Sequence, residues 1–235
     1  EDYILKLFRR VQPGLNPDLE MTAFLSEQAR FAAVPPLAGF AELVEARHGT
    51  TTIAMAQQYV PAATDAYESI AETLTAWLLA PGTVTTEFAT EVAADLGGLT
   101  GGLHAALAAD PTGHGLPEMA PREATRAEVR TWAERARADL DRALDLLPAT
   151  TDEGAALRRL APRLAEILTV LDGQTATPEV IRAHGDLHLG QILFAPDGMR
   201  VIDFEGEPLS TPDERRAHRH PLRDVASMLR SIDHV

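Results

Sequence analysis

The sequence predicts an α+β fold in which strands gather near the N-terminus and helices fill most of the remainder. Two observations support this: short β-prone runs within the first sixty residues, and apolar residues at helical spacing from Thr64 onward. A second pair of short apolar runs late in the chain predicts one further hairpin. At 235 residues the chain can bury a sizeable core, as one large domain or as two lobes.

The first sixty residues predict a strand, a helix and two more strands, in that order. Residues 3–8 (YILKLF) are short, apolar and β-prone, and a PGLNP turn follows them. Asn16 is expected to cap a helix that has a proline at its first position and runs to about Arg30. Residues 37–46 and 51–60 are strand-like runs joined by RHGT, which predicts a β-hairpin.

Helical spacing dominates the middle of the chain, and its breaks fall at proline and glycine. The four helices expected there span residues 65–80, 84–109, 121–147 and 153–171. A further helix is expected close to the C-terminus, because four apolar residues there form one helical stripe. We expect this stripe to face the core: Leu222, Val225, Leu229 and Ile232.

Composition limits the classes of function. The chain has no cysteine, which excludes disulfides and thiolate metal sites and fits a cytoplasmic protein. A formal net charge of −14 argues against binding a phosphate backbone, so no nucleic-acid partner is expected. No uncharged run reaches membrane-spanning length, so no membrane association is expected either. The chain begins without Met and stops soon after the last helical run, which predicts a fragment of a longer protein.

Two polar runs late in the chain are expected to meet in space. HGDLHLGQ (184–191) leads into one strand-like run and DFEGEP (203–208) follows the next, with an APDG turn between the two strands. Because QILF and MRVI then pair as a hairpin (191–202), both polar runs lie at its open end. Asp186 and Asp203 are therefore predicted to lie close together.

Two carboxylates at one end of a hairpin repel each other, which requires a cation, a shared proton or full solvation. Mg²⁺ held by one or two carboxylates together with phosphate oxygens would meet that requirement. The alternative is a pair of solvated turn aspartates that cap helices.

Lys6 is the cation that the sequence offers to an anionic ligand. It shares one face of the first strand with Ile4 and Phe8, so its ammonium group must reach solvent or find an anion. Glu20 lies one turn into the following helix, and a Lys6–Glu20 pair would hold the ammonium ready for a phosphate. An edge-strand lysine that reaches solvent is the alternative.

These residues resemble the small-molecule kinases of the protein-kinase-like fold, the aminoglycoside and choline phosphotransferase group. HGDLHLGQ resembles their catalytic loop and IDFEGEP their metal-binding segment. With PLRDVASMLRSID and KLFRRVQPGLNPDLE, the chain resembles actinobacterial maltokinases more closely, over residues 1–60 and 180–235. The resemblance implies a bilobal fold, with a partial N-terminal lobe over residues 1–60 and a truncated, mostly helical C-terminal lobe over residues 61–235.

The resemblance also implies roles in phosphoryl transfer for the two polar runs. Asp186 would be the catalytic aspartate that accepts or orients the proton of a sugar hydroxyl. Gln191 and Asp203 would bind Mg²⁺, and Glu205 could touch a second metal ion.

For the nucleotide, the resemblance implies a site in the N-terminal lobe. Lys6 would contact the α- and β-phosphates of ATP, and Glu20 would steady Lys6. The hinge between the lobes, whose backbone meets adenine, would consist of Gln58, Tyr59 and Val60.

Four further residues are expected to support the catalytic loop. Arg223 and Asp224 would brace it from a helix, and His184 and His188 would be structural members of the loop. Two other histidines have no partner in sequence and are expected to be incidental: His104 and His114.

A metal-dependent hydrolase is the alternative reading of HGDLH. In an extended strand His184, Asp186 and His188 would point the same way, as metal ligands do. Residues 218–220 (HRH) are the only candidates for the remaining ligands.

We therefore expect an ATP-dependent sugar kinase with ATP and Mg²⁺ as cofactors, most simply one that converts maltose to maltose 1-phosphate. A glucosamine, other aminosugar or aminoglycoside kinase is the nearest alternative, and the acidic composition would suit a cationic acceptor. A catalytically silent kinase-like binding module is a third class. The sequence leaves open the acceptor sugar, the oligomeric state and the partner enzymes.

Overall fold

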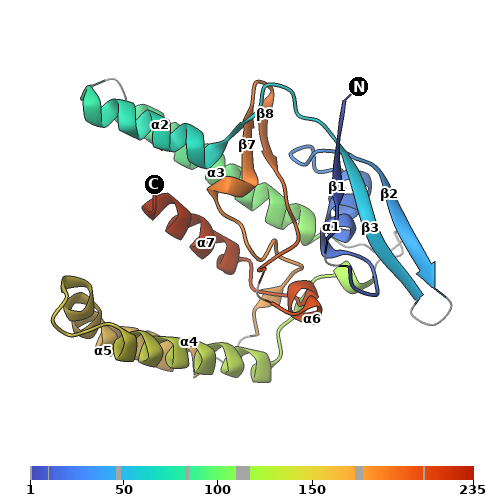
Figure 1. Ribbon diagram of the computed structural model, residues 1–235. Coiled ribbons are helices and arrows are strands. Elements are labelled where there is room, and N and C mark those ends of the chain that lie inside the picture. The colour runs from blue at the N-terminus through green and yellow to red at the C-terminus, as the bar shows by residue number, and fades with distance from the viewer. Residues whose placement is uncertain are drawn as a thin grey trace. The chain divides into compact units, whose positions relative to one another are not determined.

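Strands are concentrated at the start of the chain and helices in its middle, which confirms the α+β prediction (Figure 1). The computed structural model describes residues 2–9, 11–45, 49–82, 85–109, 117–172, 177–208 and 210–235. The chain forms two compact units, Glu1–Pro121 with Ile181–Val235, and Arg122–Val180. This partition differs from the lobes expected at residues 1–60 and 61–235, which stay a prediction.

A three-stranded antiparallel sheet opens the first unit. Its strands are β1 (Tyr3–Leu7), β2 (Leu37–Glu45) and β3 (Gly49–Gln58), in the order β1-β3-β2. The predicted hairpin is β2–β3, and residues 46–48 at its tip lie outside the described residues. Lys6 on β1 lies opposite Met55, which is fully buried on the central strand.

The helix after β1 begins where the sequence predicts but changes character early. Asn16 accepts a hydrogen bond from the backbone of Asp18, and α1 (Pro17–Ala23) follows with proline at its first position. From Phe24 to Gln28 the chain is π-helical (η1). Arg30, the predicted helix end, has a φ of 51°. The α-helix is thus shorter than expected, and its start is what positions the acidic residues of its first turn.

The rest of the first unit consists of helices around a small sheet. The helices are α2 (Ala66–Leu79), α3 (Thr86–Leu107), α6 (Pro212–Arg216) and α7 (Leu222–Asp233), with 3₁₀ turns η2 (Pro117–Met119) and η3 (Leu189–Gln191). The sheet has the order β4-β7-β8, with β4 (Thr64–Asp65), β7 (Ile192–Ala195) and β8 (Gly198–Val201). Ala195 pairs with Gly198, so the predicted turn at Pro196 and Asp197 is confirmed.

The core of this unit lies beneath the late hairpin and the loop that precedes it. Leu103 and Leu107 of α3 are fully buried there together with Leu187 and Ile192. About 25 cal/mol per Å² of apolar surface removed from water makes such burial the main stabilising contribution. The loop that carries the polar run therefore packs against the buried apolar core.

The predicted core stripe of the C-terminal helix is wrong. Leu222, Leu229 and Ile232 of α7 are 63%, 63% and 42% exposed. The buried face of α7 carries Asp224 and Met228 instead. The helix is turned this way because the Asp224 carboxylate meets buried backbone donors, a requirement that hydrophobic periodicity does not register.

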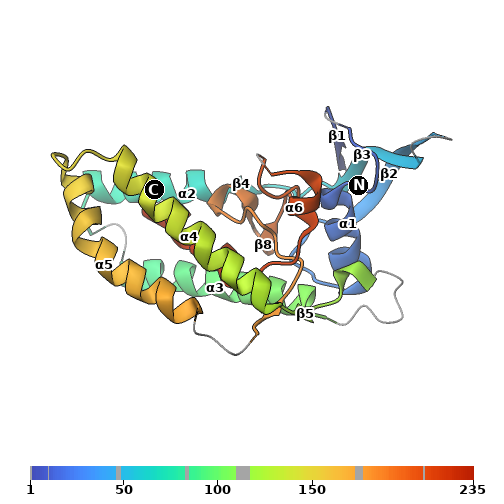
Figure 2. The same ribbon diagram turned by 90° about the horizontal axis from the view of Figure 1, so that it is seen from below.

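The second unit is an antiparallel helix pair, α4 (Arg126–Leu146) and α5 (Asp152–Asp172), which run alongside each other in Figures 1 and 2. A short ladder of β5 (Arg122–Glu123) and β6 (Glu179–Val180) closes it. The first helix starts five residues later than predicted, because Thr125 and Glu128 form a reciprocal capping box. No helix among the described residues is long and apolar enough to cross a membrane.

Candidate active site

The two polar runs lie against each other at the open end of the β7–β8 hairpin. His184 donates from Nε2 to the carbonyl of Ile202 at 3.1 Å, and its ring centroid lies 4.8 Å from that of Phe204. A Cβ on Gly185 would lie 3.7 Å from the Cα of Gly206, so the two backbones approach closely. Both glycines have positive φ, 86° and 73°, a conformation that residues with a Cβ rarely adopt. The predicted meeting of the runs is confirmed.

Helix α7 holds the first run, the HGD loop, at both ends. The Asp224 carboxylate accepts the backbone N–H groups of His184 (3.0 Å) and Gly185 (2.9 Å). Two turns further along the same helix, the Ser231 hydroxyl accepts the N–H of Leu189 at 3.0 Å. The loop that carries Asp186 is therefore fixed by its backbone to one helix.

Two of the sequence expectations about this bracing need correction. Arg223 is exposed, and its guanidinium makes no hydrogen bond or ion pair with the described part of the loop. His104, expected to be incidental, lies with Nε2 3.0 Å from Oδ2 of Asp224. Although burial by itself would raise it, the pKa of Asp224 is lowered by the hydrogen bond from His104, the charge of His184 and the Gly185 N–H. His114 lies outside the described residues.

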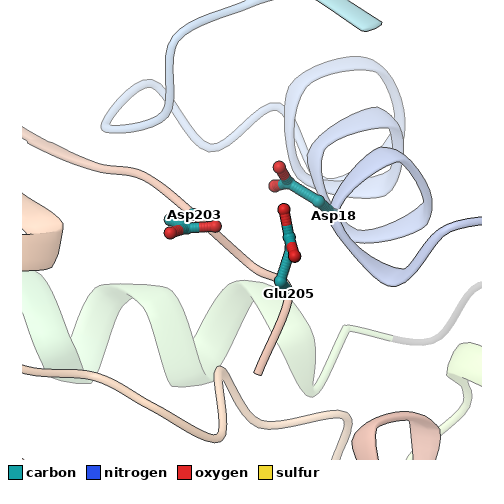
Figure 3. Close-up of side chains that lie close together, drawn as sticks. All are labelled: Asp18, Asp203 and Glu205. Carbon is teal, nitrogen blue, oxygen red and sulfur yellow. The ribbon is translucent and has the colours of Figure 1, made fainter. Parts of the chain in front are cut away.

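The Lys6 ammonium lies among three carboxylates. Its Nζ is 2.8 Å from Asp18, 2.7 Å from Asp203 and 2.7 Å from Glu205. Figure 3 shows these acids close together, Asp18 on α1 and the other two on the segment after β8. The predicted Lys6–Glu20 pair is wrong. Residues two apart on a helix point about 200° away from each other, so only one of the two acids on α1 can face the strand.

Asp18 joins the lysine to the second run. It is 1% exposed, and its second oxygen accepts the backbone N–H of Phe204 at 3.0 Å. Burial raises the pKa of Asp18, although Lys6 opposes the shift. For Lys6, burial alone would lower the pKa, but the surrounding carboxylates, Asp18 foremost, raise it above its ordinary value. The pair is thus held together by charge inside a largely desolvated site.

The carboxylate cluster fits a divalent cation. Asp18, Asp203 and Glu205 each offer an oxygen within 4.8 Å of the others, and three carboxylates exceed the one ammonium by two negative charges. Oxygen ligands of this kind are those that Mg²⁺ prefers. Asp203 also has a φ of 63°, an uncommon backbone conformation for a residue with a side chain, which is typical of functional sites. In the part of the chain that the structure describes, this is the only such group of His, Cys, Asp or Glu side chains.

Glu20 is a structural ion-pair centre rather than the partner of Lys6. Its fully buried carboxylate binds Arg182 at 2.8 Å and Arg216 at 2.6 Å. Arg182 lies just before the HGD loop and is itself 2% exposed. The short helix α1 thus carries both acids: Asp18 faces Lys6, and Glu20 faces the two arginines.

A cavity of about 420 Å³ opens beside the charged cluster. Lys6, Asp18 and Asp203 are among the residues that line it. The remaining lining is mostly apolar and includes Ile4, Leu193 and Ile202. It also includes the expected hinge residues, Gln58, Tyr59 and Val60. A ligand with a flat apolar part and an anionic part would match this division of the walls.

Each histidine of the HGD loop has a bonding partner in the protein: His184 bonds the Ile202 carbonyl, and His188 bonds within the loop. The Gly190 N–H donates to Nδ1 of His188, and Nε2 of that ring lies 3.2 Å from the Gln191 carboxamide. Nδ1 accepts this hydrogen bond, so in the neutral ring the proton is on Nε2. Nε2 then donates to the carboxamide oxygen of Gln191 when that oxygen is oriented toward the ring. His218 bonds the carbonyl of Ala120. The structure therefore does not gather these rings into the metal site that a hydrolase would need.

The environment of Asp186 raises the proton affinity of its carboxylate. Its carboxylate is half-buried and has no hydrogen-bond partner among the described residues. Burial raises the pKa of Asp186, opposed by the nearby His188 and assisted by Glu207. A carboxylate with a raised pKa is a better proton acceptor at neutral pH than an ordinary aspartate.

Comparison with known proteins identifies the family of the chain. A model of the phosphotransferase enzyme family matches residues 1–234. The chain belongs to this family. The chain is 35% identical over 224 residues to a glucosamine kinase of Streptacidiphilus jiangxiensis, covering 95% of this chain and 47% of that protein. It is 36% identical over 123 residues to a glucosamine kinase of Mycolicibacterium smegmatis, covering 52% of this chain and 30% of that protein.

Solved structures agree with the sequence relatives. A glucosamine kinase in complex with glucosamine, ADP and inorganic phosphate has a TM-score of 0.81 and 33% identity, covering 99% of this chain and 52% of that chain. A glucosamine kinase in crystal form B has a TM-score of 0.80 and 32% identity, covering 99% of this chain and 53% of that chain. The kinase-like α+β fold is thereby confirmed, within the aminoglycoside phosphotransferase-like group. The chain spans about half the length of these relatives or less, and the expected maltokinase identity is not supported.

Sequence analysis missed several residues that hold this site together. They are Asp18, His104, Arg182, Arg216 and Ser231. Only the first left a usable signal, because two acids stand in the first turn of one helix and either could face Lys6. The others act through contacts between segments far apart in the chain.

Proposed function

We propose that this chain is part of a kinase that transfers the γ-phosphoryl group of ATP to a hydroxyl group of an aminosugar, glucosamine in the first instance. The observation that carries the proposal is the Lys6–Asp203 ion pair at 2.7 Å. Both residues line the mostly apolar cavity, and Asp203 begins the run that packs against the HGD loop. Phosphoryl transfer requires mainly alignment of the reactants and neutralisation of charge, and this arrangement provides groups for both.

The cavity suits ATP in one orientation. The adenine would lie between the apolar walls beside the hinge, Gln58 to Val60, with the phosphates toward Lys6. A magnesium ion would be held by Asp203 and Glu205, and when bound it would neutralise phosphate charge. Gln191, whose carboxamide pairs with His188 in this structure, would become a further oxygen ligand only after turning away from that ring. Lys6, kept cationic by its three acidic neighbours, would orient the phosphates.

Asp186 would handle the acceptor hydroxyl. In the reaction the sugar oxygen forms a bond to the γ-phosphorus, and the bond from the γ-phosphorus to the bridging oxygen of ADP breaks. ADP leaves with that electron pair, and the hydroxyl proton passes to the Asp186 carboxylate. The raised pKa of Asp186 favours its acceptance of that proton.

An amine-bearing acceptor fits this site better than maltose. The relatives described above are glucosamine kinases, and one was solved with glucosamine, ADP and inorganic phosphate. Burial is the main cause of the raised pKa of Asp186, and the charges of Glu207 and Asp203 add to it while His188 and His184 oppose it, so two further carboxylates lie on this side of the loop. A cationic ammonium group on the sugar is attracted to such a surface, whereas neutral maltose gains nothing from it.

A panel of acceptors tests the proposal directly. ADP release from the protein with ATP and Mg²⁺ should be fastest with glucosamine, and much slower with N-acetylglucosamine, its neutral counterpart, or with maltose. Asp186→Asn should abolish the reaction and leave ADP affinity unchanged, while Asp197→Asn, in the exposed hairpin turn, should change neither. Faster turnover with maltose would restore the maltokinase assignment. Nucleotide binding with no turnover on any sugar would indicate a silent binding module.

A further inference from the structure

The geometry points to His104 as a positioning residue for the HGD loop, acting through Asp224; we propose this role on the basis of the proposed catalytic function of Asp186. His104 lies in the last turn of α3, far from the loop in sequence. Its Nε2 is 3.0 Å from Oδ2 of Asp224, and that carboxylate accepts two backbone N–H groups of the loop. Helices α3 and α7, joined by this contact, are both labelled in Figure 1.

The three donors share the two oxygens of one buried carboxylate. Oδ1 accepts the Gly185 N–H, while Oδ2 accepts both the His184 N–H and the His104 ring. Asp224 is 0% exposed, so each donor replaces hydration that the charged group has lost. Removing His104 would leave Oδ2 with one donor. The charged form of the carboxylate that holds the loop would then be less stable.

His104 is itself held rigidly. Its neighbours Leu103 and Leu107 on α3 are fully buried, and the side chain of His104 is 14% exposed. On the other side of the contact, Met228 anchors α7 in the same core. The imidazole therefore links two core helices, and its N–H is fixed in direction before any ligand binds.

The position of the loop backbone bears directly on Asp186. The two N–H groups that Asp224 accepts belong to the two residues immediately before it, and Gly185 already has a φ of 86°. A change in that left-handed turn would swing the Asp186 carboxylate relative to the cavity. Misplacement of a catalytic group by about 1 Å can cost about 10²-fold in rate, so a distant clamp can be decisive.

Four variants separate a donor role from simple packing. His104→Leu fills the space without a donor, and His104→Gln can place an amide N–H close to the position of Nε2. His104→Asn keeps polarity but is too short to reach Oδ2. Thr100→Val is the matched control, because Thr100 is buried on the same helix and its hydroxyl bonds only to Leu96 within that helix.

Amide hydrogen exchange of the segment 183–187, followed by mass spectrometry, reads the clamp without requiring activity. We expect exchange at His184 and Gly185 to be about tenfold faster in His104→Leu and His104→Asn, the effect of losing one charge-assisted hydrogen bond. His104→Gln and Thr100→Val should exchange like the wild type. In steady-state kinetics, kcat of the Leu and Asn variants should fall by about tenfold or more while the Kd for ADP stays constant.

The outcomes are distinct for this inference and for the proposed function. Equal exchange in all variants, or faster exchange in His104→Gln to the same extent as in His104→Leu, would overturn the positioning role. If His104→Leu does not fold, the comparison of His104→Asn with His104→Gln decides the question in the same way. Absence of phosphoryl transfer in the wild type would refute the proposed function alone, because the exchange measurement still reports on the loop.

Discussion

The carboxylate of Asp18 binds the ammonium group of Lys6 at 2.8 Å, and its other oxygen accepts a hydrogen bond from the backbone after Asp203. One buried side chain thereby fixes the relative position of the strand lysine and the metal-binding segment. Water screens this pair from one side only, because the carboxylate is 1% exposed and the lysine side chain is 32% exposed.

Replacing Asp18 with Asn should therefore impair the use of ATP. The amide oxygen can still accept the Phe204 N–H, but Lys6 loses its most buried countercharge. We expect kcat/KM for ATP to fall by about 10²-fold, the scale typical of a lost electrostatic group in an active site. Steady-state kinetics with varied ATP measures this, with the exposed Asp95→Asn as control. Unchanged kcat/KM for ATP would show that Lys6 needs only its other two acidic neighbours.

Glu20→Gln should act on stability first. The substitution leaves Arg182 buried at 2% exposure without its counterion and also weakens the bond to Arg216. Breaking a buried pair in this way costs about 3–5 kcal/mol in the free energy of unfolding. Urea denaturation provides the measurement, and Glu72→Gln on the exposed face of α2 should change stability by less than about 0.5 kcal/mol. A wild-type midpoint in Glu20→Gln would mean that the two arginines are solvated on their own.

The pH dependence of turnover should report the environment of Asp186. Its pKa is raised by burial, and the carboxylate must be deprotonated to accept a proton. Activity is then present above the raised pKa and lost as pH falls through it, so the acid limb of kcat should lie above about pH 4, the ordinary value for aspartate. A pH–rate profile at saturating substrates tests this. An acid limb at or below pH 4 would contradict a buried base at this position.

The pH dependence of stability, rather than of rate, should report the environment of Asp224. Its pKa is lowered in the folded state, so the charged carboxylate stabilises the fold above the ordinary aspartate pKa. That stabilisation is lost as pH falls through the ordinary value toward the lowered one. The difference in unfolding free energy between the wild type and Asp224→Asn should shrink as pH falls from about 5 to about 3. A difference that stays constant over this window would show that Asp224 titrates normally.

Removal of magnesium should expose the role of the carboxylate cluster. With EDTA, phosphoryl transfer should stop, and the affinity for ADP should no longer respond to Asp203→Asn. With Mg²⁺ present, Asp203→Asn and Glu205→Gln should each raise the metal concentration needed for half-maximal activity by about 10-fold or more. Glu207→Gln lies outside the cluster and serves as control. A wild-type metal requirement in both cluster variants would place the metal elsewhere.

Much of the fold followed from local sequence. The β2–β3 and β7–β8 hairpins, the capped start of α1 at Asn16 and the helical middle were all predictable, because turn residues, caps and periodicity act over a few positions. The closeness of the two polar runs was also predictable, since a hairpin brings its flanks together whatever surrounds it.

The partners of the charged residues were not predictable in the same way. The choice of Asp18 over Glu20 for Lys6 depends on the rotation of α1 against β1, and the exposure of Leu229 depends on the rotation of α7. Rotation of a helix about its axis is set by every contact it makes, including bonds such as Asp224 to His184 that join segments 40 residues apart. The sequence by itself determined the elements, their order and the pairing of the late hairpin. Tertiary packing decided which acid faces which base, because buried charges require partners that only the assembled chain brings within reach.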